Sequence, residues 1–301
     1  YMARAIELAR QAVRTVSPNP PVGAVVVRAG HIVGEGHTQP PGRAQAQIMA
    51  LDQAGANARG AELYVTLEPC AHQGRTGPCT AAIIAAGIRR VHIAALDPNR
   101  LTDGRGVHTL ERGGISVLLR EGNLEARELV EAFTKHVTTG MPFAVAKFAA
   151  SLDGKIATKT GESQWITSPN ARKLGHCLRN THDAILVGIN TVLADNPALT
   201  TRGIPEGRHP VRVVLDSYGR LPENSRLLAE DGVSVFVATG RDAQNDGFCE
   251  RPHVTVLQAT TVRPELSWVL DQLAERGHRK VLIEGGSQLH ASALVANLPN
   301  R

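Results

Sequence analysis

Two cysteines separated by eight residues are the clearest candidates for chemistry in the first half of the chain. Cys70 and Cys79 each follow a proline, and residues 63–67, which we predict as a strand, end shortly before the first of them. Two thiolates at the end of a strand are ligands that suit a zinc ion. The chain has two other cysteines, Cys177 and Cys249, which stand alone and are interpreted as small packing or surface residues.

The helix expected upstream of the cysteines carries the side chains that would complete such a site. It spans residues 45–54 and begins with the triplet Gln-Ala-Gln. The pattern resembles the cytidine-deaminase superfamily, in which a histidine at the first of these positions is the third zinc ligand and a glutamate at the third moves protons. The resemblance implies that Cys70, Cys79 and Gln45 occupy the metal positions, and Gln47 the catalytic proton-shuttle position.

Both glutamines weaken the chemistry that this resemblance implies. An amide is a poorer zinc ligand than imidazole beside two thiolates. Gln47 cannot ionise, and loss of a general base typically costs about 10²–10⁴ in rate. We therefore predict an altered zinc site and an impaired deaminase. Two alternatives stay open: the glutamines are tolerated and deamination persists, or Cys70 and Cys79 are buried thiols that remain from an ancestral site.

Further motifs narrow the resemblance to one family. Residues 18–23 (PNPPVG), residues 97–99 (DPN) and the long cysteine spacer resemble the bifunctional deaminase/reductase family of riboflavin biosynthesis. The resemblance implies a first domain that deaminates a pyrimidine with a phosphoribosylamino group. It also implies a second domain that is an NADPH-dependent reductase with a dihydrofolate-reductase-like fold.

Six stretches in the second half of the chain resemble motifs of that reductase. They are residues 147–157, 161–167, 176–179, 183–188, 191–202 and 283–287. The resemblance assigns cofactor binding to Ala149, Trp165, Thr191, Asp195, Ser217, Gly285 and Gly286. It assigns substrate binding to Lys147, Asp153, Ser163, Arg179, Leu199, Arg202 and Glu284. The implied reaction transfers a hydride from NADPH to C1 of the ribosyl group of 5-amino-6-(5-phosphoribosylamino)uracil, which opens the ring to a ribityl chain.

The residue types alone agree with phosphorylated small-molecule ligands. Arginine forks such as Arg179 and Arg202 suit phosphate oxygens, and Gly285-Gly286 before a predicted helix lets backbone N–H groups approach a phosphate. A net charge of +5 and a pI near 9.3 also favour anionic partners. The chain has only two Trp, three Tyr and five Phe to stack on bases, so we predict no nucleic-acid partner.

Two α/β domains must position these residues, because helical and strand patterns alternate through both halves. We place a cytidine-deaminase-like zinc domain at residues 1–140 and the reductase domain at residues 141–301, with residues 137–142 as a linker. The strands expected in the second domain are residues 143–150, 184–187, 211–215, 233–238 and 280–283. Members of the family continue beyond the last helix, so we expect the reductase sheet to be incomplete at its C-terminal edge.

The remaining expectations concern location and partners. No apolar run reaches the roughly eighteen residues that span a bilayer, and residues 1–8 favour an amphipathic helix over a signal peptide. We predict a cytoplasmic homo-oligomer that binds a phosphorylated pyrimidine and no membrane. The alternative to an enzyme is a non-catalytic homologue that binds pathway intermediates or another protein.

Overall fold

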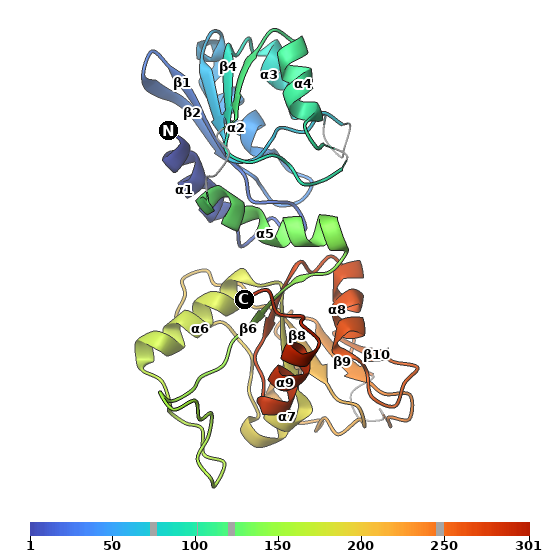
Figure 1. The fold of residues 1–301 in the computed structure, drawn as a ribbon. Helices are drawn as coiled ribbons and strands as arrows, with labels where there is room; N and C mark the ends of the chain where they lie inside the picture. Colours follow the sequence, from blue (N-terminus) through green and yellow to red (C-terminus); the bar gives the residue numbers. More distant parts are fainter. Residues whose placement is uncertain (73–76, 101, 120–123, 245–249) are drawn as a thin grey trace. The chain divides into compact units, whose positions relative to one another are not determined.

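The structure is a computed structural model, and it describes every residue except 73–76, 101, 120–123 and 245–249. The chain folds as two compact units, Tyr1–Gly140 and Met141–Arg301 (Figure 1). Each unit is a β-sheet packed with helices, which confirms the predicted α/β fold class.

The first unit is built on a mixed sheet with the strand order β2-β1-β3-β4-β5. β1 pairs antiparallel with β2 and β3, whereas β3, β4 and β5 run parallel. The strands span Gly23–Arg28 (β1), His31–His37 (β2), Glu62–Val65 (β3), Arg90–Ile93 (β4) and Ser116–Leu119 (β5). The helices span Met2–Ala12 (α1), Ala46–Ala54 (α2), Cys79–Ala85 (α3), Arg105–Arg112 (α4) and Leu124–Thr139 (α5), with a 3₁₀ turn at Gly55–Ala58 (η1).

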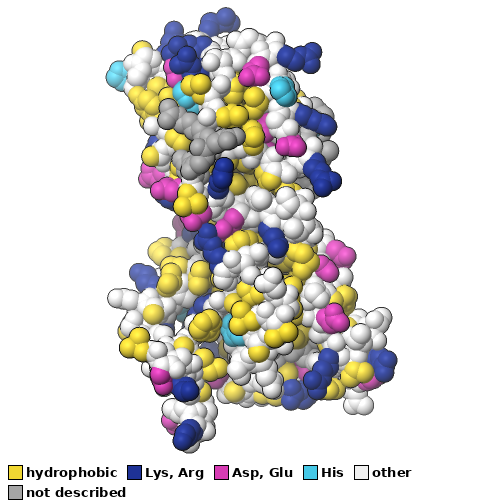
Figure 2. All heavy atoms as spheres, in the orientation of Figure 1, with side chains coloured by type: hydrophobic (Ala, Val, Ile, Leu, Met, Phe, Trp, Pro, Cys, Tyr) yellow, Lys and Arg dark blue, Asp and Glu magenta, His cyan; other side chains and the backbone are white. Residues whose placement is uncertain are grey.

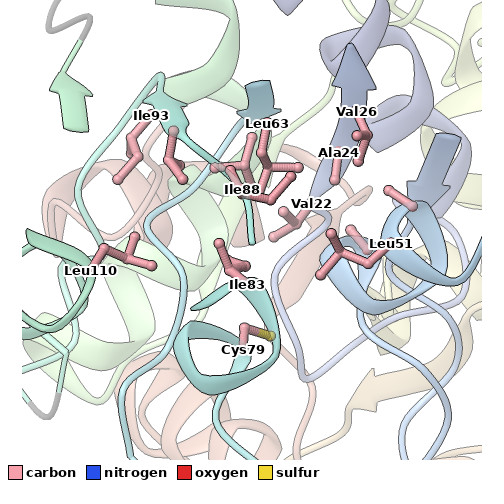
Figure 3. Packing of buried hydrophobic residues seen from close by; sticks show 14 of the residues in the cluster. Val22, Ala24, Val26, Leu51, Leu63, Cys79, Ile83, Ile88, Ile93 and Leu110 are labelled. Carbon is pink, nitrogen blue, oxygen red and sulfur yellow. The ribbon is translucent and has the colours of Figure 1, made fainter. Parts of the chain in front are cut away.

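The main core of this unit lies between the sheet and the helices α2, α3 and α4. Figure 3 shows Val26 and Leu63 from the strands beside Leu51 from α2 and Ile83 from α3. Cys79, the first residue of α3, is fully buried in the same cluster. Apolar burial therefore holds this thiol in place independently of any polar neighbour.

The second unit is built on a parallel sheet with the strand order β10-β9-β8-β7-β11-β6. The strands span Phe143–Ala146 (β6), Ala184–Gly188 (β7), Val211–Leu215 (β8), Val235–Thr239 (β9), Val254–Gln258 (β10) and Lys280–Ile283 (β11). The helices span Pro169–Thr181 (α6), Ile189–Asp195 (α7), Leu266–Glu275 (α8) and Ser287–Val295 (α9), with a 3₁₀ turn at Arg226–Leu228 (η2). Ligands of open parallel sheets bind beyond the carboxyl ends of the strands, so the loops at that edge are where a site is expected.

Two sequence-based boundaries were wrong, and one strand was missed. The strand predicted over residues 143–150 ends at Ala146, and the chain then leaves the sheet as a long segment with a turn at Gly154, where φ is +78°. The linker predicted over residues 137–142 is helical as far as Thr139, where α5 ends, and Gly140 follows with φ at +78°. The strand β10 was missed because Thr255 and Gln258 break the apolar run in residues 254–258 (VTVLQ).

Within the described residues, no helix is both long and apolar enough to cross a bilayer. On the face drawn in Figure 2, Lys and Arg side chains lie in small groups separated by hydrophobic and neutral surface. The positive net charge is therefore spread over this face instead of being gathered along one element.

Candidate active sites

The two cysteines and the two glutamines come together in the first unit. Gln45 is the N-cap residue of α2, and Gln47 is buried in the first turn of that helix. The Cys79 thiol contacts Oε1 of Gln45 and lies 3.6 Å from Oε1 of Gln47. The Cys70 thiol lies 3.6 Å from the same Gln45 oxygen, and its sulfur accepts the backbone N–H of Cys79 at 3.4 Å. The four side chains form one cluster, which we call the thiol–amide cluster.

Hydrogen bonding between the two cysteines makes their acidities different. The bond from the Cys79 side chain lowers the pKa of Cys70 to about 6, although burial acts in the opposite direction. The same bond and burial together raise the pKa of the Cys79 thiol far above its usual range. Cys70 is therefore the more acidic thiol of the pair.

The thiol–amide cluster lacks the donors of a three-ligand zinc site. Structural and catalytic zinc sites use thiolate, imidazole and carboxylate ligands, whereas Gln45 offers a neutral amide oxygen. Within the part of the chain that the structure describes, no group of three or more His, Cys, Asp or Glu could hold a metal ion. His72 lines the adjoining cavity but completes no such group. These residues fit a zinc ion poorly.

A cavity of about 410 Å³ lies beside the cluster. Three members of the cluster, Gln45, Gln47 and Cys70, line it. The other lining residues are Pro18, Asn19, Pro20, Val22, Thr38, Gln39, Gly42, Arg43, Leu67, Glu68, His72, Asp97, Asn99 and Phe133. Two of the motifs that suggested the family, residues 18–23 and 97–99, thus contribute to one cavity wall. The fold brings these two motifs together, although about 80 residues separate them in the sequence.

Glu68 also lines this cavity, and its role was not predicted from the sequence. It is 3% exposed, and its carboxylate accepts four backbone N–H groups, from Asp97 at 3.2 Å, Gly104 at 3.1 Å, Gly106 at 2.9 Å and Val107 at 3.2 Å. These bonds tie the loop after β4 and the start of α4 to the strand end that carries Cys70. The signal available in the sequence was a carboxylate directly before the Pro-Cys pair, in an otherwise apolar stretch.

In the second unit, Arg179, Glu284 and Lys147 form a compact ion cluster. Arg179 donates from Nε to Oε1 of Glu284 at 2.9 Å and from Nη2 to Oε2 at 2.7 Å, and its Nη1 donates to the Thr200 carbonyl at 3.1 Å. Lys147 Nζ lies 3.7 Å from the same carboxylate. Burial alone would raise the pKa of Glu284, but the two cations hold it below its ordinary value. Glu284 is therefore ionised and fixed in direction.

The predicted phosphate ligands differ in what they offer. The fork of Arg179 is occupied by Glu284, so in this structure it positions that carboxylate. Arg202 is exposed, and its backbone N–H donates to Nδ1 of His176 at 3.3 Å. Burial, and then the charges of Arg179 and Arg202, lower the pKa of His176, which keeps the ring neutral and able to accept. Leu199 is buried.

A second cavity, of about 730 Å³, lies at the carboxyl ends of β7, β8 and β11. It is lined by Gly188, Ile189, Asn190, Thr191, Leu215, Ser217, Tyr218, Arg220, Arg263, Gly286, Ser287, Gln288, Leu289, Ala291 and Ser292. Three of the predicted cofactor residues, Thr191, Ser217 and Gly286, are therefore brought together. Thr191 also accepts the Gly286 N–H at 3.1 Å, and His290 accepts that of Gly285 at 3.4 Å.

The other predicted cofactor and substrate residues lie outside this lining. Asp153, Ser163 and Trp165 belong to the segment between β6 and α6, which projects from the sheet in Figure 1. Trp165 is 70% exposed, and the Arg172 guanidinium lies 4.4 Å from its ring centroid. Asp153 is exposed and bonds to the Ser151 hydroxyl. Ala149 and Asp195 also lie off the cavity wall.

The cavity has the properties that a phosphate-bearing dinucleotide requires. Its volume suits a ligand of that size class, and Gly286 is the N-cap of α9, where backbone N–H groups and the helix dipole favour anions. Tyr218, Arg220 and Arg263 add cationic and polar groups that the sequence analysis missed. The described residues therefore fit NADPH.

Each of the two units matches a known protein family. A model of the RibD C-terminal domain matches residues 142–301, and a model of the cytidine and deoxycytidylate deaminase zinc-binding region matches residues 1–95. The riboflavin biosynthesis protein RibD of Aquifex aeolicus is 44% identical over 294 residues, which cover 98% of this chain and 82% of that protein. The RibD of Escherichia coli is 40% identical over 310 residues, covering 99% and 84%.

Solved structures of similar proteins superpose on almost the whole chain. The diaminohydroxyphosphoribosylaminopyrimidine deaminase/5-amino-6-(5-phosphoribosylamino)uracil reductase of Thermotoga maritima superposes with a TM-score of 0.89 at 42% identity, over 98% of this chain and 83% of that one. Acinetobacter baumannii RibD, form 1, superposes with a TM-score of 0.88 at 38% identity, over 99% and 83%. The chain belongs to the RibD family of riboflavin biosynthesis, with a deaminase domain of the zinc-binding family followed by an NADPH-dependent reductase domain.

Proposed function

We propose that this protein acts mainly as the reductase of 5-amino-6-(5-phosphoribosylamino)uracil and that its deaminase step is impaired. The contrast between the two sites carries the proposal. The reductase unit holds an ordered ion cluster of Lys147, Arg179 and Glu284 next to a cavity suited to NADPH. The deaminase unit holds amides at the two positions where a metal ligand and a proton shuttle are needed.

The roles of the reductase residues follow from their chemistry. When bound, NADPH supplies the hydride. Glu284, ionised and held by Arg179, is suited to accept hydrogen bonds from hydroxyl groups of the ribosyl chain. Lys147, 3.7 Å from Glu284, is a neighbouring cation that can donate to an oxygen of the same chain. Arg202 is the exposed cation suited to the substrate phosphate.

The roles of the deaminase residues follow in the same way. Gln45 is neutral and Gln47 has no ionisable proton, so neither replaces imidazole as a ligand or carboxylate as a base. The cavity walls beside them are intact, and Asn19 and His72 remain available to a ligand. We propose that this cavity still accepts the diaminopyrimidine substrate but turns it over slowly.

One experiment separates the two halves of the proposal. Purified protein is supplied with the deaminated substrate and NADPH, and oxidation of the cofactor is followed. The same sample is supplied with the diamino substrate, and released ammonia and bound zinc are measured. We expect NADPH oxidation, little ammonia and substoichiometric zinc. Binding of NADPH without its oxidation would instead support a non-catalytic homologue.

A repaired variant is the matched control for the deaminase. Gln45→His combined with Gln47→Glu supplies the missing ligand and base, and should raise ammonia release by about 10²-fold or more. The reductase rate of the same variant should not change. Ammonia release by the unaltered chain at the rate of the repaired variant would contradict the proposed impairment.

Cytoplasmic location, homo-oligomerisation and the absence of a nucleic-acid partner stay predictions.

A further inference from the structure

The cavity of the second unit has a basic end. Arg220 and Arg263 line it beside Ser217 and Tyr218. None of the described residues that line this cavity is Asp or Glu. The two arginines come from different segments, one directly after β8 and the other between β10 and α8. The fold therefore gathers two cations here without a carboxylate to neutralise them in the wall.

The strand order places this end away from the ion cluster. Glu284 follows β11 and Lys147 follows β6, and these strands are neighbours at one side of the sheet. Ser217 follows β8, which lies two strands from β11 and beside β9. A dinucleotide with its reactive ring toward Glu284 and its phosphates toward Gly286 would have its adenosine end at the β8 side.

Arg263 is held against the turn after β8. Its Nε donates to the Tyr218 hydroxyl at 3.2 Å, and its guanidinium carbon lies 5.9 Å from the centroid of the Tyr218 ring. Gly240 donates its N–H to the Ser217 carbonyl at 3.1 Å. A Cβ at Gly240 would lie 2.0 Å from the Val262 carbonyl oxygen, so only glycine lets the two segments approach this closely. The basic group is thus largely pre-formed, which lowers the entropic cost of binding.

Arg220 is oriented from the other wall. Its Nη2 donates to Oδ1 of Asn190, in the first turn of α7, at 3.1 Å. This bond uses one of the five guanidinium N–H groups, which leaves others for a ligand. Two guanidinium groups that approach from separate segments suit a doubly charged phosphate, because each can supply a fork of donors.

We propose that Arg263 and Arg220, with Tyr218 positioning Arg263, form the subsite for the adenosine 2′-phosphate and make the reductase select NADPH over NADH. The two cofactors differ only by that phosphate. Sites that select NADH place a carboxylate on the ribose hydroxyls, whereas an arginine accommodates the phosphate. The only charged side chains in the described lining of this cavity are the two arginines. The inference rests on the proposed reductase function and assigns the selectivity of its cofactor site.

Binding of nucleotide fragments tests the subsite without turnover. Adenosine 2′,5′-bisphosphate and 5′-AMP are titrated into the full chain by calorimetry. The unaltered protein should bind the bisphosphate more tightly. Arg263→Ala should weaken the bisphosphate by about 10- to 100-fold, as expected for lost charge-assisted hydrogen bonds. The affinity for 5′-AMP should stay within about twofold.

A matched control distinguishes a specific contact from a general change of charge. Arg241 is an exposed arginine that follows β9, pairs with Asp242 and does not line the cavity. Arg241→Ala removes the same charge close by and should leave the bisphosphate affinity within about twofold. An equal loss in Arg241→Ala and Arg263→Ala would overturn the proposal.

Steady-state kinetics provides the second readout. Arg263→Ala should raise KM for NADPH by about 10-fold or more with kcat nearly unchanged, and should leave KM for NADH unaltered. Tyr218→Phe keeps the ring but removes the hydroxyl that orients Arg263, so a smaller rise is expected. Equal use of both cofactors by the unaltered protein would sink the selectivity proposal alone. Failure to oxidise either cofactor would instead refute the reductase function.

Discussion

Replacing Glu284 by glutamine tests whether the reductase ion cluster is ordered by charge. The side chain is 9% exposed and accepts two hydrogen bonds from Arg179, with Lys147 at 3.7 Å. Glutamine keeps the shape but removes the charge, and its amide N–H₂ must face a guanidinium donor. We therefore expect Glu284→Gln to destabilise the second unit substantially.

The expected cost can be worked from these contacts. Charge-assisted hydrogen bonds contribute about 1.5–3 kcal/mol each and neutral ones about 0.5–1.5, so two bonds lose about 2–3 kcal/mol in total. A donor of Arg179 left without an acceptor adds about 1–2 kcal/mol. The sum, about 3–5 kcal/mol, matches the usual cost of breaking a buried ion pair by removing one partner.

Tryptophan fluorescence during urea unfolding is the appropriate assay. The chain has two tryptophans, Trp165 and Trp268, and both lie in the second unit, so the signal follows that unit alone. Glu230→Gln, at an exposed position of the same unit, is the control and should change the free energy of unfolding by less than about 0.5 kcal/mol. A loss below about 1 kcal/mol in Glu284→Gln would refute the argument, because the cluster would then be held by packing instead of charge.

Three other outcomes are expected. Glu68→Gln should weaken acceptance of the four backbone N–H groups and speed amide exchange at Val107, measured by hydrogen exchange, with a cost of about 2 kcal/mol. Burial lowers the pKa of His182 to about 4, below its value in the unfolded chain. Protonation of His182 should therefore lower the stability of the second unit by about 2 kcal/mol between pH 7 and pH 5 in urea unfolding, and His182→Gln should remove that part of the loss. Gln45→His with Gln47→Glu should raise bound zinc toward one equivalent per chain by metal analysis.

The alternating elements and the main motifs were predictable from the sequence, because buried strands such as residues 184–188 and 211–215 are short apolar runs. The side chains with which the site residues pair were not predictable from the sequence. Arg179 was predicted as a phosphate ligand, yet its fork is satisfied by Glu284, 105 residues away. Only the fold shows which of the two arginines, Arg179 or Arg202, keeps an unoccupied fork for a ligand. Arg263 was missed because it lies in a loop that carries no motif of its own.

The burial of Cys79 bears on how the thiol–amide cluster should be interpreted. A cysteine that served only as a metal ligand would have little reason to remain once the other ligands changed. Cys79, however, is fully buried among Ile83 and other apolar side chains of the main core, where replacing it would open a cavity or strand a polar group. Packing thus gives Cys79 a role that does not depend on bound zinc. Cys70 is only partly buried, so it is the cysteine whose presence carries information about the metal.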